Sequence, residues 1–154
     1  MELTAFFLLI FIGRTGTEFR NCCIEKRIDL KSFFAWGIEI AKSLGNIHRQ
    51  NVIHKDINPG NILINRETQK IQIIDFGIST ELNREQQDLD IANRLEGSLA
   101  YISPEQTGRM NRSMDYRTDL YSLGITFYQL LTGRLPFEAE DPMEMLHCHI
   151  AKAP

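Results

Sequence analysis

The 154-residue chain lacks the features that mark several classes of protein. Its net charge is only −3 and it has no long run of like charge, so the basic face expected of a nucleic-acid-binding protein is missing. Its three cysteines are an odd number with two of them adjacent, which is a poor basis for disulfides and predicts reduced thiols in the cytoplasm. With 43% hydrophobic residues, the chain can bury one ordinary core.

A long hydrophobic segment is also missing. Residues 3–12 (LTAFFLLIFI) are almost all apolar, but a helix that spans a bilayer needs about 20 such residues. Only Glu2 precedes the run, so it has no basic region of the kind that starts a signal peptide. We expect a buried strand here and no membrane association. The alternatives are membrane insertion or a stretch that is not native to the domain.

The cysteine and histidine residues near the C-terminus give a weak metal signal. Cys148 lies between His147 and His149, and all three side chain types bind metal ions. The two histidines are two residues apart on an expected helix, so they point in different directions around it. We therefore expect ordinary, half-buried helix residues here and no metal site.

Hydrophobic spacing predicts three helices. In residues 30–48 apolar side chains recur every three or four positions, and Asp29 is well placed to cap this helix. Residues 119–131 are apolar nearly all round, which predicts a helix in the centre of a core that ends at Gly133. A last helix is predicted over residues 142–151, because it begins with an Asp-Pro pair suited to an N-cap and a first helical position.

Two short β-branched runs predict a hairpin between the first two helices. Residues 62–64 and 71–74 are rich in isoleucine, and a polar turn at residues 65–69 joins them. Residues 81–96 are polar and weakly periodic, so we expect a long surface loop, which is often a functional element.

Polar residues flank this hairpin where a purely structural hairpin does not need them. His54-Lys55-Asp56 precedes it, Asn61 opens it, and Asp75-Phe76-Gly77 follows it. Phosphoryl transfer needs a carboxylate to orient the attacking hydroxyl and oxygen ligands for Mg²⁺. A hairpin brings its two ends together, so Asn61 and Asp75 are expected to lie near Asp56.

These residues belong to four motifs that resemble those of protein kinases. HKDINPGN at residues 54–61 resembles the catalytic loop, and DFG at residues 75–77 matches the magnesium motif. SPE at residues 103–105 resembles the end of the activation segment, and DLYSLG at residues 119–124 resembles the start of the central C-lobe helix. One triplet is weak evidence, but four motifs in the right order are strong. The chain is similar to eukaryotic-like (Hanks-type) Ser/Thr kinases, and most to the kinase modules of large bacterial multi-sensor proteins.

The resemblance implies a fold and a reaction. The fold class would be α+β, a partial protein-kinase-like fold made of a mainly α-helical C-terminal lobe with a small β-hairpin at the catalytic loop. The parent protein would transfer the γ-phosphate of ATP to a protein hydroxyl in signal transduction, with ATP and Mg²⁺ as cofactors. It would be fused to sensory and histidine-kinase domains.

The resemblance also assigns roles to single residues. Asp56 would be the catalytic base, with Asn58 beside it, and Asn61 and Asp75 would bind the metal and the nucleotide phosphates. Ser98 occupies the place of a hydroxyl that bonds to the catalytic aspartate. The remaining positions would be structural or regulatory: His54, Lys55, Phe76, Gly77, Glu105 and Asp119.

Two of these positions depart from the family pattern. Asn58 replaces a common lysine that contacts the transferring phosphate, and an amide carries no charge. Loss of that cation should slow transfer, because electrostatic stabilisation dominates this chemistry. Lys55 replaces an arginine that clamps a phosphorylated loop through two parallel bonds, which a lysine cannot make.

The motifs of the ATP-gripping lobe are missing. The chain has no Gly-rich loop of the G-x-G-x-x-G type and no strand with a Val-Ala-Ile-Lys-like lysine. We therefore expect residues 24–154 to be a partial kinase domain that lacks the N-terminal lobe and the last helices. Residues 1–23 are left unassigned, and a non-native or frameshifted stretch is one interpretation of them. The isolated chain is expected to be inactive.

Two other functions compete with the kinase prediction. A catalytically dead, kinase-like interaction module is disfavoured by the intact set of Asp56, Asn61 and Asp75. A small-molecule phosphotransferase of the aminoglycoside type shares the Asp-x4-Asn spacing. Such enzymes lack an activation segment that ends in a Pro-Glu pair, and this chain has one at residues 104–105.

Overall fold

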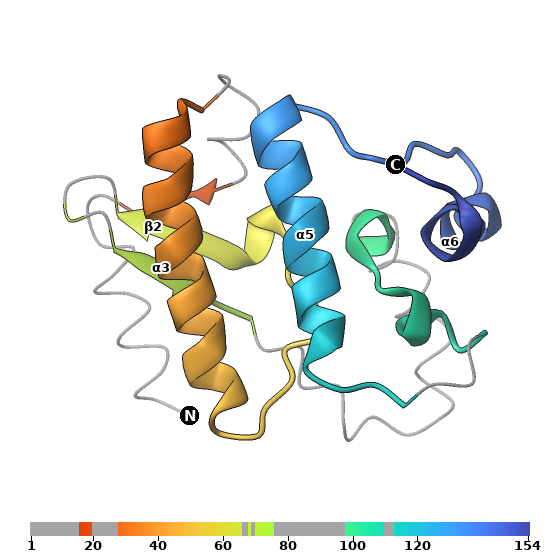
Figure 1. Ribbon diagram of the computed structural model, residues 1–154, viewed down its shortest axis with the longest axis horizontal. Helices are drawn as coiled ribbons and strands as arrows, with labels where there is room; N and C mark the ends of the chain where they lie inside the picture. Colours follow the sequence, from red (N-terminus) through yellow and green to blue (C-terminus); the bar gives the residue numbers. More distant parts are fainter. Residues whose placement is uncertain (1–15, 20–27, 66–67, 69, 76–97, 110–112) are drawn as a thin grey trace.

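The computed structural model describes residues 16–19, 28–65, 68, 70–75, 98–109 and 113–154. Helices dominate, and a small sheet lies beside the long helix α3, as the sequence predicts (Figure 1). The elements are, in chain order, β1 (Gly16–Glu18), α3 (Leu30–His48), η1 (Pro59–Asn61), β2 (Ile62–Asn65), β3 (Ile71–Ile73), η2 (Leu99–Tyr101), η3 (Pro104–Thr107), α5 (Arg117–Thr132) and α6 (Pro142–Ala151).

Helix α3 begins and ends where the hydrophobic spacing predicts. Asp29 caps it, because one carboxylate oxygen accepts a hydrogen bond from the Ser32 backbone N–H at 3.0 Å. The helix buries Ile40 and Leu44 against the sheet and α5. These contacts stabilise the helix more than its intrinsic propensity does.

The predicted hairpin is present, and a third strand extends it. Strands β2 and β3 pair antiparallel, with Ile62 opposite Ile73, while β1 pairs antiparallel with the other edge of β2. Phe19 follows β1, is completely buried and packs edge-on against Trp36 with ring centroids 5.7 Å apart. A strand of three residues is too short to show the alternation of apolar and polar side chains that marks a strand in a sequence. Pairing with β2 therefore defines β1, and its own sequence does not.

Helix α5 lies beside α3 (Figure 1) and starts two residues before the predicted position. The helix packs into the core as expected, but only on one side, because Leu120 and Leu131 are 47% and 40% exposed. Its buried face instead includes Ser122 and Thr126, whose hydroxyls donate to backbone carbonyls one turn earlier at 3.3 and 2.9 Å. Hydroxyls that are satisfied within their own helix can be buried at little cost.

Helix α5 ends at Gly133 and α6 starts after Asp141, both as predicted. Gly133 has a φ of 75°, a left-handed conformation that favours glycine. Asp141 accepts a hydrogen bond from the Met143 N–H at 3.0 Å. Helix α6 then closes a second hydrophobic cluster with α5 and η2, formed by Leu99, Ile125, Phe137, Met145 and Cys148.

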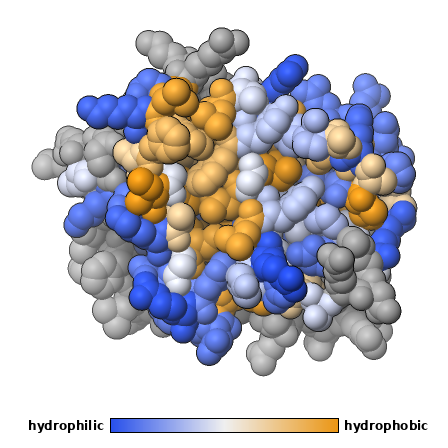
Figure 2. Space-filling view, viewed as in Figure 1, coloured by the Kyte–Doolittle hydropathy of each residue, from blue (hydrophilic) through white to orange (hydrophobic). Residues whose placement is uncertain are grey.

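The apolar face of α3 is wider than its contact with the core. Leu30, Phe34 and Ile38 follow one another every four residues and are 65%, 60% and 53% exposed. Figure 2 shows a continuous hydrophobic area over α3 that extends toward α5. In the described ranges no helix has both the length and the hydropathy to cross a membrane. The apolar run at residues 3–12 and the loop at residues 81–96 lie outside the described residues.

Candidate active site

The loop between α3 and β2 is attached to α5 by one buried carboxylate. Asp119, in the first turn of α5, is completely buried. One of its oxygens accepts from His48 Nε2 at 2.7 Å and from the His54 backbone N–H at 2.9 Å. The other accepts from the Lys55 N–H at 2.7 Å. Three donors from two segments satisfy the carboxylate, as a buried charge requires.

His48 is a site residue that the sequence interpretation missed. It lies in the last turn of α3 and bonds to a residue 71 positions later. A histidine in the last turn of a predicted helix is compatible with ordinary capping. The sequence pattern therefore gave no sign of a partner so far along the chain.

His54 connects the loop to the end of β3. Its ring is 1% exposed, and Nε2 lies 3.1 Å from the carbonyl oxygen of Ile74. The backbone N–H of Asp56 donates to Nδ1 at 3.3 Å. An Nδ1 that accepts leaves the ring hydrogen on Nε2, where it can donate to Ile74. This placement favours the structural role expected for His54; the predicted neighbours Phe76 and Gly77 lie outside the described residues.

Three side chains orient the Asp56 carboxylate. Asn58 Nδ2 and Ser98 Oγ both donate to one oxygen, each at 2.9 Å. Asn61 Nδ2 donates to the other oxygen at 2.8 Å. Ser98 comes from a segment 42 residues away, so the predicted hydroxyl contact joins two distant parts of the chain.

The two asparagines also shape the turn that carries Asp56. Asn58 Oδ1 accepts from the Gly60 N–H at 2.8 Å and caps η1. Asn61 Nδ2 donates to the Asp56 backbone carbonyl as well, at 2.8 Å. Because its nitrogen faces Asp56, the Oδ1 of Asn61 faces away from it.

Asp75 follows β3 in a left-handed conformation with a φ of 55°, and its side chain is exposed. The Ile74 N–H donates to the Asn61 carbonyl at 2.9 Å, so Asp75 lies one residue beyond the last pair at the open end of the hairpin. Its carboxylate makes no hydrogen bond or ion pair with the residues that the structure describes. Non-glycine residues in this conformation concentrate at functional sites.

Asn61 and Asp75 suit a magnesium ion that also binds phosphate. They offer an amide oxygen and a carboxylate, which are hard ligands. Within the described ranges, no group of three or more His, Cys, Asp or Glu side chains could hold a metal by itself. Mg²⁺ commonly takes one or two protein ligands and completes its coordination with phosphates and water.

The segment after Ser98 is attached to α5 as well. Glu105, in η3, accepts a hydrogen bond from the buried Thr118 hydroxyl at 2.7 Å. This bond is a specific contact for the glutamate that was expected to anchor the segment.

The histidines around Cys148 lie in different environments. His147 is exposed, whereas His149 is 5% exposed and its Nδ1 lies 2.9 Å from the Tyr121 hydroxyl. Burial lowers the pKa of His149 and raises the pKa of Tyr121 to about 12. Phe137 packs edge-on against the His149 ring at 5.1 Å, so this histidine lies against the second hydrophobic cluster.

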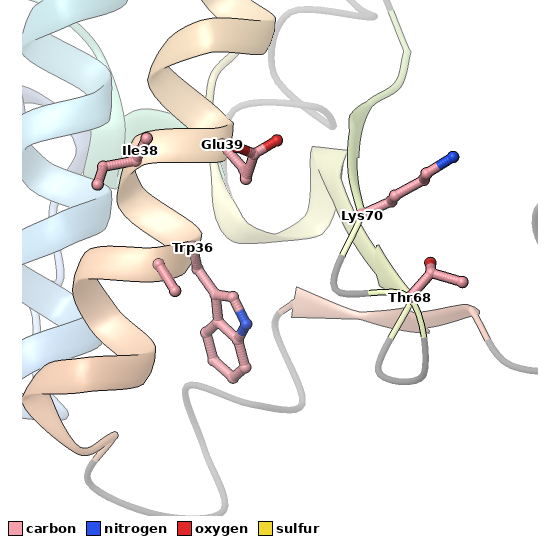
Figure 3. A pocket seen from close by; sticks show the side chains of 6 residues that line it. Trp36, Ile38, Glu39, Thr68 and Lys70 are labelled. Carbon is pink, nitrogen blue, oxygen red and sulfur yellow. The ribbon is translucent and has the colours of Figure 1, made fainter.

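A groove of about 380 Å³ lies between α3 and the β2–β3 turn. Ala35, Trp36, Ile38 and Glu39 of the helix and Thr68 and Lys70 of the turn line it. Figure 3 shows Glu39 on the side of the helix toward Thr68 and Lys70, whereas the Ile38 side chain points away from them. None of the predicted site residues lines it, and the Glu39 carboxylate is already paired with Lys42 at 2.8 Å.

Comparison with known proteins found similar sequences over most of the chain. The family model described as protein kinase domain matches residues 7–153. A probable serine/threonine-protein kinase of Clostridium perfringens is 40% identical over 74% of this chain and 16% of its own length. A probable serine/threonine-protein kinase of Clostridium acetobutylicum is 34% identical over 82% of this chain and 19% of its own length. The hybrid signal transduction histidine kinase G of Dictyostelium discoideum is 29% identical over 82% of this chain and 6% of its own length. The chain therefore spans less than a fifth of the length of these relatives.

Proposed function

Because this chain belongs to the protein kinase domain family, we propose that its parent protein is a serine/threonine kinase that transfers the γ-phosphate of ATP to a protein hydroxyl. The observation that carries the proposal is the Asp56 carboxylate, which is oriented by Asn58, Asn61 and Ser98 at 2.8–2.9 Å. The names of the bacterial relatives favour this reaction over small-molecule phosphorylation.

Asp56 would act as the base that orients the substrate hydroxyl and accepts its proton. A carboxylate is effective in this role when its oxygens are held in a fixed direction toward the reacting group. The three donors fix that direction before substrate arrives. Ser98 also links the base to the segment that ends at Glu105, so disorder in this segment would release one of the three bonds.

Asn61 Oδ1 and the Asp75 carboxylate would hold Mg²⁺. A bound ion would supply positive charge that offsets the negative charge developing on the phosphates during transfer. The orientation of the Asn61 amide supports this assignment, because its nitrogen is committed to Asp56 by two bonds of 2.8 Å. The exposed Asp75 carboxylate can approach an ion without losing a partner among the described residues.

Asn58 would provide hydrogen bonds but no positive charge to the site. Its amide is used by Asp56 and by the Gly60 N–H, at 2.9 and 2.8 Å. We therefore expect slower transfer than in kinases with lysine at this position, since a cation stabilises the transferring phosphate.

The test is phosphate transfer from γ-labelled ATP by the full-length parent protein. Asp56→Asn should lower kcat at least about 100-fold, because general base catalysis typically contributes that much. Asp115→Asn is the matched control, since this exposed carboxylate contacts Arg117 rather than the site. Full activity of Asp56→Asn would contradict the proposal and favour a kinase-like interaction module instead.

The organisation of the parent is a further part of the proposal. We expect residues 24–154 to supply its catalytic lobe. The assignment of residues 1–23 stays open, although β1 and the buried Phe19 pack into the same core. The match to a hybrid histidine kinase supports a parent with several signalling domains. The 154-residue chain, without the motifs that grip ATP, should show no transfer and no Mg·ATP binding by calorimetry. We expect the parent to act in the cytoplasm on protein substrates and not on nucleic acids.

A further inference from the structure

Gln106 joins the segment after Ser98 to the loop that carries Asp56. Its Oε1 accepts from the backbone N–H and the hydroxyl of Ser103, at 3.1 and 3.0 Å. Its Nε2 donates to the backbone carbonyl of Lys55 at 2.8 Å. The Ser103 N–H can only donate and the Lys55 carbonyl can only accept, so the two partners fix the orientation of the amide.

Lys55, the residue held by Gln106, has an unfavourable backbone conformation. Its φ of 68° places it in the left-handed region, which residues other than glycine rarely occupy. Its N–H is bound by Asp119 at 2.7 Å, and its carbonyl by Gln106. Both peptide groups of the residue before Asp56 are therefore held by side chains, and such strained conformations persist only when their surroundings enforce them.

The same segment contacts the Asp56 side chain. Ser98 Oγ donates to the carboxylate at 2.9 Å, and Gln106 binds the backbone immediately before it. The two bonds come from residues eight positions apart, on either side of the short helix η2. A shift of this segment would thus change both the backbone and the carboxylate of the base.

We propose that Gln106 is a positioning residue that stabilises the left-handed backbone of Lys55 and thereby sets the direction of the Asp56 carboxylate. This inference rests on the proposed kinase function. Gln106 does not touch the reacting atoms; it acts through Lys55. Through this contact, Asp56 is placed correctly only when the segment from Ser98 to Thr107 is ordered.

The first experiment measures phosphate transfer by the full-length parent. Gln106→Met, which keeps the side chain's length and removes its hydrogen bonds, should lower kcat about tenfold, the effect of one hydrogen bond on the barrier. KM for ATP should stay unchanged, because only the placement of the base is altered. Gln129→Met is the control: it removes a bond of 2.6 Å from Tyr101, which ties the same segment to α5 rather than to Lys55. An equal loss in both variants would overturn the inference.

The second experiment tests whether Gln106 is needed because the backbone of Lys55 is strained. Glycine adopts a φ above zero without steric cost, so Lys55→Gly should remove the need for Gln106. In that background Gln106→Met should lower kcat only about twofold instead of tenfold, a non-additive pair as expected for residues in direct contact. The same loss in both backgrounds would contradict the proposed role.

A third measurement does not depend on activity. In the 154-residue chain, the NMR coupling between the amide and α protons of Lys55 reports its φ. Gln106→Met should change this coupling and speed exchange of the Asp56 amide, whereas Gln129→Met should not. If the parent proves inactive but these changes occur, the kinase proposal fails and the positioning contact stands. If φ and exchange stay the same in Gln106→Met, the contact does not position the loop.

Discussion

Replacing Asp119 by asparagine should test how the loop is held. The substitution keeps the shape of the side chain but exchanges one acceptor oxygen for an NH₂ group. In the structure both oxygens accept bonds, from His48 and His54 on one side and from Lys55 on the other. Whichever way the amide turns, its NH₂ group faces an N–H donor, and that donor is left without a partner in a fully buried site.

The expected loss is about 3–5 kcal/mol in the free energy of unfolding. A hydrogen bond to a charged group contributes roughly 1.5–3 kcal/mol, and one such bond is lost completely. The other two become bonds to a neutral amide, which are about half as strong. Removing one partner from a buried charged cluster typically costs about 3–5 kcal/mol, which agrees with this sum. Domains of this kind have a total stability of only about 5–15 kcal/mol.

Urea unfolding of the 154-residue chain measures this loss. Trp36 is the single tryptophan and packs against Phe19, so its fluorescence reports the core between α3 and the sheet. With a urea dependence of about 2 kcal/mol per molar, the midpoint of Asp119→Asn should fall by about 1.5–2.5 M.

Asp115→Asn is the matched control for this measurement. Asp115 precedes the same helix, and its bonds to Arg117 hold its carboxyl pKa at about 2, but the pair is exposed. Exposed ion pairs contribute little to stability, so its midpoint should barely move. Equal midpoints for the two variants would show that Asp119 does not anchor the loop.

Three other predictions follow from described residues. Burial lowers the pKa of His149 from 6.5, so the unfolded state binds a proton more readily. The free energy of unfolding should fall as the pH drops below about 6.5, and His149→Gln, unlike His147→Gln, should flatten this fall; equal slopes would contradict it. Gly133→Ala should destabilise the chain to urea by about 1–2 kcal/mol because φ is 75°, whereas Gly124→Ala, inside α5 with nothing within 4 Å of an added Cβ, should stabilise it by roughly 0.5–1 kcal/mol. Asn58→Lys should raise kcat of the full-length parent by restoring a cation, and a lower kcat would refute this reading of the departure.

The elements with local signals could be predicted from the sequence. Helix α3 shows its periodicity and its Asp29 cap within 20 residues, and the end of α5 is set by Gly133. Strand β1 could not be predicted, because pairing with β2 defines it. The buried face of α5 was predicted wrongly, because apolar residues such as Leu120 and Leu131 lie outside the core and hydroxyl residues such as Thr126, which bond within their own helix, lie inside it.

In the candidate site, too, relations between residues close in sequence could be predicted and long-range contacts could not. Asp56 and Asn61 lie close in sequence, and the motif they share with kinases indicated their relation. The contacts of His48 with Asp119 and of Gln106 with Lys55 span 71 and 51 residues, so no local pattern indicates them. They exist only once α3, α5 and η3 have packed around the loop.

The anchor from α5 also bears on how the site can diversify. Asp119 binds the backbone N–H groups of His54 and Lys55 and makes no contact that requires the Lys55 side chain. Any residue except proline can present an N–H at position 55. Lysine at position 55 can therefore be replaced by arginine without loss of the hydrogen bonds from Asp119. Such a replacement would change how the loop binds a phosphate group but not how it is attached to α5.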